Sequence, residues 1–234
     1  LLDEINYSKH KKLNFNNSYK PPLCGGVIVY ISSLIFFSNG LILLKIFGLV
    51  ILTIGIFSDI NKISSPKIRI LLQMLPLLLF VIFNDLRITD LRIGLFNELL
   101  DIKYVSIIFT VFCLLILLNG SNFLDGLNTL VIGYYILVSV ILILVSAQFN
   151  LLLNDNIFYF LIFLIIIFLF NFFGKIYLGD SGSYLISFFA AFFILDFIIN
   201  NVRVSPYLVC LLLWYPAFEN LFSILSNFIF LYKF

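Results

Sequence analysis

Four carboxylates stand beside small or amide residues in an otherwise apolar sequence. They are Asp59, Asp125, Asp180 and Glu219, and each lies at the end of a long apolar run. Carboxylate oxygens suit hard cations such as Mg²⁺, and ionisable groups near membrane depth usually form ion, proton or substrate sites. A single carboxylate at a helix end could equally cap the helix or mark the membrane interface. Their occurrence together at corresponding ends of several runs favours one shared polar site.

The segment 119–128 is rich in groups that could bind a phosphate. It reads NGSNFLDGLN and combines three amides, among them Asn122 and Asn128, with Asp125 and two glycines. A carboxylate can hold a metal, amides can donate to phosphate or base edges, and glycines let the backbone approach a ligand. The alternative is a tight interhelical turn capped by Asn and Asp side chains.

The segment 174–183, GKIYLGDSGS, has a similar character. It places Asp180 beside hydroxyls and glycines just before a predicted helix, whose N-terminus would favour an anionic ligand. Lys175 could neutralise a phosphate, and Tyr177 could stack on a base. A tyrosine at the membrane interface is the simpler interpretation of Tyr177.

Asp59 is followed by Lys62 one helical turn later. The pair could serve a metal and a phosphate. It could also be a plain side-chain pair in a basic loop beside the membrane.

The composition places these segments in a membrane protein. Hydrophobic residues make up 62% of the chain and charged residues only 11%, which a water-soluble domain of 234 residues would not show. The net charge of +2, without a basic stripe, argues against a nucleic-acid partner. The three cysteines stand singly and indicate no metal site.

Eight apolar runs have about the length of roughly 20 residues that crosses a bilayer. They lie near residues 23–39, 41–57, 68–84, 103–119, 127–147, 157–173, 183–199 and 206–222. A ninth run, 221–232, is either a continuation of the eighth or a separate span. Their continuous apolarity differs from the alternation of barrel strands, so we predict an all-α polytopic bundle of eight or nine spans.

The loops between successive spans must alternate between the two faces of the membrane. The four carboxylates then share one face with 1–22, 58–67, 119–126 and 174–182. This face holds the excess of Lys and Arg, which predicts that it is cytoplasmic. The segment 85–102 falls on the other face and is amphipathic, so it could lie along the membrane surface.

Three motifs in order resemble the polyprenyl-phosphate N-acetylhexosamine-1-phosphate transferases, relatives of lipid I synthase and of the undecaprenyl-phosphate GlcNAc-1-phosphate transferases. They are Ser58-Asp59 with Lys62, Asn122-x-x-Asp125-Gly-x-Asn128, and Gly179-Asp180-Ser-Gly-Ser. The likeness runs from about Asp3 to Ser223 and includes Pro216-x-x-Glu219.

The resemblance implies transfer of a sugar 1-phosphate from a UDP-N-acetylhexosamine to polyprenyl phosphate, with release of UMP. It implies Mg²⁺, with Mn²⁺ as an alternative, bound by Asp180 and Asp59. It makes Asp59, Asp125 and Asp180 catalytic. The expected substrate-binding residues are Lys62, Asn122, Asn128, Tyr177, Lys175 and Glu219. The expected setting is the bacterial inner membrane with the site facing the cytoplasm, and a homodimer.

The chain also departs from the family pattern. Ser58 stands where a second acid is common, and Asn128 replaces an aspartate, as in the branch devoted to surface polysaccharides such as O-antigen. The first span and the last His- or Arg-rich loop are not recognised. We therefore expect residues 1–234 to be a single transferase domain and part of a fold of 10 or 11 spans.

Two other functions compete with this one. A transporter would place carboxylates at mid-membrane, but only Asp196 lies well inside a run, and it is near the outer end. An inactive remnant of the family would be consistent with Ser58 and the unrecognised loop.

Overall fold

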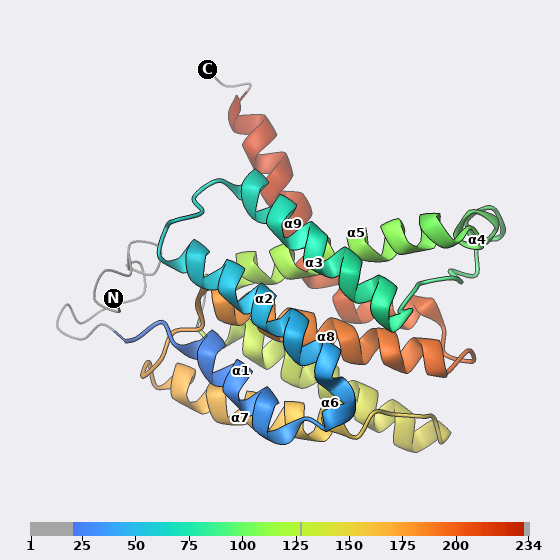
Figure 1. The fold of residues 1–234 in the computed structure, drawn as a ribbon, viewed down its shortest axis with the longest axis horizontal. Coiled ribbons are helices and arrows are strands. Elements are labelled where there is room, and N and C mark those ends of the chain that lie inside the picture. The colour runs from blue at the N-terminus through green and yellow to red at the C-terminus, as the bar shows by residue number, and fades with distance from the viewer. Residues whose placement is uncertain (1–20, 127, 232–234) are drawn as a thin grey trace.

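The structure, a computed structural model, describes residues 21–126 and 128–231. Long apolar helices make up most of this part of the chain. Figure 1 shows them packed side by side as one bundle. In chain order they are α1 (Gly25–Phe36), the 3-10 turn η3 (Asn39–Leu41), α2 (Ile42–Asp59), α3 (Pro66–Asn84), α4 (Gly94–Leu100), α5 (Lys103–Leu124), α6 (Leu130–Phe149), α7 (Asn156–Phe172), α8 (Gly179–Asn200) and α9 (Pro206–Leu231). The predicted all-α bundle is confirmed.

Five of these helices are long and apolar enough to cross a membrane: η3 with α2, then α3, α5, α6 and α8. The apolar helices α1 and α7 are shorter. Each of the eight predicted runs forms a helix, and the described part of the run 221–232 continues α9 without a break to Leu231. Within the amphipathic segment 85–102, only α4 is helical.

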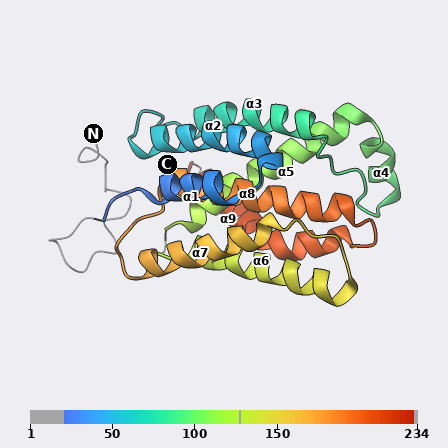
Figure 2. The same cartoon turned by 60° about the horizontal axis from the view of Figure 1, so that its bottom comes forward.

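Helix α8 runs through the middle of the bundle, as Figures 1 and 2 show. Its residues are buried along almost the whole length, because α1, α2, α5 and α6 all pack against it. Glycines allow the closest contacts. A Cβ atom on Gly55 of α2 would lie 2.3 Å from the Cα atom of Ser181, and one on Gly26 would lie 2.7 Å from the Ser181 carbonyl carbon. Small residues that let backbones approach are a common means of packing helices in membranes.

The loops alternate between the two ends of the bundle, as predicted. At one end, the C-terminus of α2 contacts the N-terminus of α8 through Asp59. At the other end, Ser38 donates its backbone N–H to Asn156 at 2.8 Å, and Asn201 bonds the backbone of Leu152. We call the end with Asp59 the site end and the opposite one the distal end.

Two helix boundaries differ from the prediction in a way that matters for the site. Helix α5 continues to Leu124 rather than ending at 119, so Asn119 and Asn122 are helical. Helix α8 begins at Gly179 rather than 183, so Asp180 lies in its first turn and not before it. Apolar runs mark only the lipid-crossing part of a helix, and polar residues that pack inside the bundle extend the helix beyond that part.

Helices α5 and α9 cross closely at Gly120 and Pro216. A Cβ atom on Gly120 would lie 2.0 Å from the Pro216 carbonyl oxygen. Pro216 is inside α9 and has no N–H, so it cannot donate to the carbonyl of Leu212 one turn earlier. The hydroxyl of Tyr134 on α6 donates to that carbonyl instead. A side chain from another helix thus replaces the backbone bond that proline removes.

Replacing Tyr134 by Phe should lower the free energy of unfolding by about 1–3 kcal/mol, because the Leu212 carbonyl would be left unpaired and buried. In a Pro216→Ala background the restored N–H can serve this carbonyl. The same replacement should then be less destabilising by at least about 0.5 kcal/mol. Denaturant unfolding in micelles measures both effects, and equal losses in the two backgrounds would contradict this account of Tyr134.

Candidate active site

Asp59 caps the buried N-terminus of α8 from another helix. One carboxylate oxygen accepts the backbone N–H of Asp180 at 2.7 Å, and the other accepts that of Ser181 at 3.1 Å. These N–H groups have no partner within α8, and the helix dipole places partial positive charge there. Gly179 has φ +73°, and a Cβ atom at this position would lie 2.9 Å from an Asp59 oxygen. Glycine therefore allows both the turn and the close approach of the carboxylate.

Asp180 is buried, with 6% of its surface exposed, and it is held by two side chains from α2 and α3. One oxygen, Oδ2, accepts hydrogen bonds from Ser58 Oγ at 2.5 Å and from Arg69 Nη1 at 2.8 Å. Arg69 also donates to Ser58 Oγ at 3.1 Å. The guanidinium lies largely inside the bundle and compensates the charge of the Asp180 carboxylate.

A second layer of polar groups joins α5 to this centre. Asn122 donates its amide to the Tyr184 hydroxyl at 3.2 Å and accepts from Ser183 Oγ at 3.1 Å. The Tyr184 hydroxyl also lies 3.4 Å from Arg69 Nη1. The motif asparagine on α5 is therefore linked to the motif aspartate on α8 through Tyr184 and Arg69.

Asn171 at the end of α7 brings two motif segments together. Its amide oxygen accepts the backbone N–H of Thr129 at 2.6 Å, and its amide nitrogen donates to the Ile176 carbonyl at 2.9 Å. Thr129 directly follows the 119–128 segment, and Ile176 lies in the loop that precedes Asp180. The link confirms that both segments lie at the site end, although they are about 50 residues apart in the sequence.

Tyr177 forms an isolated parallel bridge with Leu23 and is 3% exposed. Its backbone N–H donates to the Pro22 carbonyl at 3.0 Å, and its carbonyl accepts from Gly25 at 3.1 Å. Its ring packs with Leu23, and Ile60 lies against them. The structure thus shows Tyr177 tying the start of the bundle to the loop before α8, while stacking on a base stays a prediction.

The other predicted site residues belong to segments at the site end. Asp125 terminates α5 and is half-buried, whereas Asn128 in the following turn is exposed. Lys62 and Lys175 are exposed, and Lys62 Nζ lies 5.7 Å from the centre of the Phe57 ring. Glu219 is half-buried on α9, almost one turn beyond Pro216. Their contacts with substrate stay predictions.

Sequence reasoning does not identify Arg69 and Tyr184 as parts of the site. Arg69 was counted only as one of the basic residues of its face, yet an arginine in the first turn of a membrane helix is a signal of an internal partner. Ser183 is the last residue of the Asp180 motif and Tyr184 directly follows it, but a hydroxyl on a helix does not reveal its partner from sequence. Ser58 was noted only as the absence of an acid, whereas its hydroxyl supports Asp180.

The donor set fits a cation that is shared with a phosphate ligand. Among the described residues, no group of three or more His, Cys, Asp or Glu side chains gathers as a self-sufficient metal site. Asp59 and Asp180 are adjacent, however, and Mg²⁺ in phosphate-handling sites is usually held by one or two carboxylates together with substrate phosphates and water. Each carboxylate oxygen can accept more than one contact, so the hydrogen bonds described above leave room for a ligand.

A family model agrees with this arrangement. The model of glycosyl transferase family 4 matches residues 41–198, which include Asp59, the 122–128 motif and Asp180. The chain belongs to this family. Its members are polyprenyl-phosphate N-acetylhexosamine-1-phosphate transferases, so the resemblance seen in the sequence is confirmed. Among curated proteins no match to the chain was found.

In this family-4 transferase, the site combines two carboxylates with two positive groups. The positive groups are the Arg69 guanidinium and the N-terminus of α8, both in contact with a carboxylate. Such a site can hold a diphosphate and a cation next to the membrane and can stabilise charge that develops during phosphoryl transfer. The coarse assignment follows: a membrane transferase that acts on a lipid phosphate and a sugar nucleotide.

Replacing Asp59 by Asn should lower the free energy of unfolding by about 1–2 kcal/mol even without divalent cations, because the α8 N-terminus loses a charged cap. Unfolding in micelles with a chelator present measures this effect. The exposed Asp101 serves as control, and its replacement by Asn should change stability by less than about 0.5 kcal/mol. If Asp59→Asn lowers the free energy of unfolding only when Mg²⁺ is present, Asp59 acts as a metal ligand and does not cap α8.

Replacing Arg69 by Met should be more destabilising, by up to about 3–5 kcal/mol, because the Asp180 carboxylate would stay buried without its cation. Adding Asp180→Asn to this variant should recover part of the loss. Arg203→Met, at an exposed arginine, is the matched control. If the double variant is as unstable as the sum of the two single ones, Arg69 does not act through Asp180.

Proposed function

We propose that this transferase moves a sugar 1-phosphate from a UDP-N-acetylhexosamine to undecaprenyl phosphate and releases UMP, as the first step of a surface polysaccharide such as O-antigen. The strongest support is the placement of Asp180 in the first turn of the buried helix α8, where Asp59, Ser58 and Arg69 hold it. This arrangement lies at the end of a membrane bundle in a family that uses lipid phosphates.

The proposed reaction exchanges one phosphoanhydride bond, within the UDP-sugar, for another, within the lipid diphosphate product. A phosphate oxygen of the lipid attacks the phosphorus that carries the sugar. The bond from that phosphorus to the bridging oxygen breaks, and UMP leaves with the bridging oxygen and its electron pair. Because both reactants are anions, the site must offset repulsion and align them more than it must move protons.

The residues of the site supply positive charge at several points. Arg69 and the N-terminus of α8 lie at its centre, and the exposed Lys62 and Lys175 lie at the same end of the bundle. We assign Lys62 and Lys175 to phosphate groups, Asn122, Asp125 and Asn128 to the nucleotide and diphosphate, and Tyr177 to the uracil. Glu219 on α9 completes the proposed set. Mg²⁺ held by Asp180 and Asp59 would neutralise the diphosphate and polarise the reacting phosphorus.

Ser58 is compatible with activity although it replaces an acid that is common in the family. The attacking lipid phosphate is already anionic near neutral pH, so the reaction does not require a carboxylate as general base at this position. The Ser58 hydroxyl instead donates to Asp180 and fixes the orientation of its carboxylate. A second carboxylate within this distance would repel Asp180 unless a cation lay between them.

Two sequence features support the finer parts of the proposal. Asn128 replaces an aspartate in the manner of the surface-polysaccharide branch, which favours an O-antigen-like pathway over lipid I synthesis. The sequence predicts an excess of Lys and Arg on the face of Asp59, which supports a bacterial inner membrane protein whose site faces the cytoplasm. This excess depends on the lysines of segment 1–22, which lie outside the described residues.

Release of UMP tests the proposed reaction. The protein in detergent receives undecaprenyl phosphate, Mg²⁺ and each of several UDP-N-acetylhexosamines, and we expect UMP from at least one donor. Asp180→Asn should lower the rate by at least about 100-fold, because it removes charge at the point where the cation and diphosphate meet. A chelator should abolish the reaction and excess Mg²⁺ should restore it.

Asp101→Asn, at an exposed carboxylate outside the site, should keep the wild-type rate. If a folded wild-type protein releases no UMP from any donor, the chain is an inactive homologue. Activity that survives Asp180→Asn would instead place the chemistry elsewhere.

A further inference from the structure

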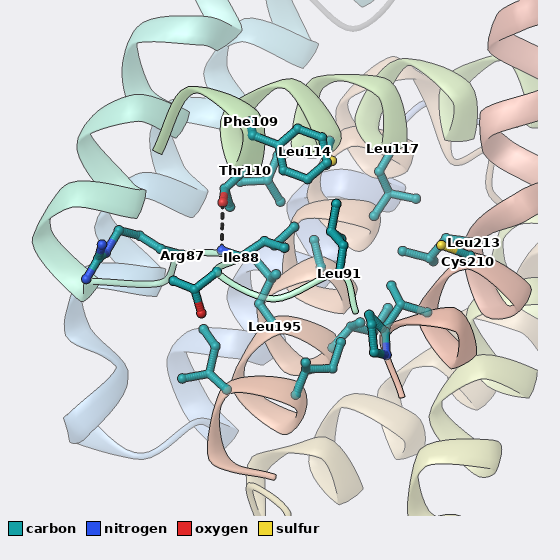
Figure 3. Close-up of a pocket in the computed structure, with 18 of the residues that line it drawn as sticks. Arg87, Ile88, Leu91, Phe109, Thr110, Leu114, Leu117, Leu195, Cys210 and Leu213 are labelled. Carbon is teal, nitrogen blue, oxygen red and sulfur yellow. Dashed lines mark hydrogen bonds between the residues drawn. The ribbon is translucent and has the colours of Figure 1, made fainter. Parts of the chain in front are cut away.

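A largely apolar cavity of about 570 Å³ lies among α5, α8 and α9 near the distal end. Figure 3 shows residues of these helices that point toward it. Both α8 and α9 pack along α5 but make few contacts with each other in the described part of the chain, so their separation opens the space. The labelled lining residues in the picture include Thr110, Leu117, Leu195, Cys210 and Leu213.

The cavity is separate from the candidate active site. Its lining extends to Leu117 on α5 and Ala217 on α9. One turn farther along α5, Gly120 lies directly against the Pro216 backbone, with no space for even a Cβ atom between them. None of the residues that form the polar centre around Asp180 lines the cavity. Its charged lining residues all lie at the distal end, where the polar group of a ligand would therefore be placed.

The distal mouth of the cavity carries both signs of charge. Asp85, Arg87, Thr89 and Asp90 line it from the connection between α3 and α4. Arg87 Nε donates to Asp85 Oδ1 at 2.8 Å, and the Asp85 side chain is 67% exposed. The backbone N–H of Ile88 donates to Thr110 Oγ1 at 2.9 Å, which fixes this connection against α5 (Figure 3). The mouth therefore presents the Arg87 guanidinium next to two carboxylates. A second guanidinium, that of Arg92, donates to the carbonyls of Val202 and Val204, which also line the cavity.

The cavity is also bordered by side chains that face outward from the bundle. Val202 is 82% exposed and Trp214 is 54% exposed, and both line the cavity. In a membrane bundle such surfaces face lipid. A mostly apolar space gives water few hydrogen-bond partners, whereas an acyl chain fits it well. Its volume lies within the range of about 300–1,000 Å³ that is usual for small-molecule sites.

We propose that this cavity binds one acyl chain of a zwitterionic phospholipid, phosphatidylethanolamine, whose head group lies at the distal mouth. The guanidinium of Arg87 contacts the head-group phosphate, and the exposed carboxylate of Asp85 contacts the ammonium. Charge complementarity favours this lipid over an anionic one, because the mouth carries both signs of charge and only a zwitterionic head group offers an ammonium to the carboxylates as well as a phosphate to the guanidinium. The site is a structural lipid site, distinct from the one that takes the lipid phosphate substrate.

Trp214 provides a direct probe because it is the only tryptophan in the chain. The purified protein in micelles is titrated with phosphatidylethanolamine carrying bromine atoms on its acyl chains, which quench tryptophan fluorescence on contact. We expect quenching that saturates at a low mole fraction of lipid. Brominated phosphatidylglycerol should need about a tenfold higher mole fraction, the factor expected for losing one favourable charged contact.

Two variant pairs separate the cavity from ordinary lipid around the protein. Cys113→Phe fills the cavity from α5, and Ile108→Phe adds the same ring to the outside of α5, where Ile108 is 66% exposed. Saturable quenching should be lost in the first variant and kept in the second. Arg87→Gln should abolish the preference for phosphatidylethanolamine, whereas Arg203→Gln should keep it. If Cys113→Phe has no thermal transition, Cys210→Phe fills the cavity from α9 instead.

Three results would overturn the proposal. Equal quenching in the Phe variants would show that Trp214 senses only surrounding lipid. Equal binding of the two brominated lipids would refute the head-group assignment. Displacement of the brominated lipid by undecaprenyl phosphate at equal mole fraction would show that the cavity holds the tail of the substrate.

Discussion

The capping of α8 by Asp59 is the interaction on which the rest of the structure depends. Helix α8 is buried along almost its entire length, so the N–H groups of its first turn cannot reach water. An unpaired N–H in such a position is strongly unfavourable, and the two oxygens of Asp59 satisfy those of Asp180 and Ser181. This requirement sets the depth of α2 relative to α8. It also brings Ser58, the residue before Asp59, within reach of the Asp180 side chain.

Burying Asp180 at this position creates a second requirement, a compensating cation. Arg69 meets it from the first turn of α3, and the Tyr184 hydroxyl and Asn122 extend the network to α5. In a low dielectric, an ion pair of this kind adds little net stability but makes the arrangement of the three helices specific. The same charges can also serve the binding of a diphosphate, which is the role proposed for them. The side chains that hold these helices together are therefore the same ones that are proposed to act on the substrate.

The region between α8 and α9 differs from this centre because mostly apolar side chains line it. Helix α9 is attached to α5 by the contact of Gly120 with Pro216 and to α6 by Tyr134. Beyond the crossing, α8 and α9 diverge along α5, and the space between them is apolar with a charged mouth. Helices α5 and α9 are thus in close backbone contact at Gly120 and Pro216, whereas α8 and α9 stay apart and leave the apolar cavity between them.

Much of this protein follows from the sequence by itself. The lengths of the apolar runs determined the helices and their alternation between two ends, because the thickness of the bilayer and the need to pair every backbone group leave few alternatives. The motifs around Asp59, Asn122 and Asp180 determined the family, because their residue types and order are specific. Only the tertiary structure decided that Asp59 caps α8, that Arg69 neutralises Asp180 and where the cavity lies. These features depend on the rotation of each helix and on its distance from its neighbours, which glycines such as Gly55 and Gly120 set through contacts between residues far apart in the chain.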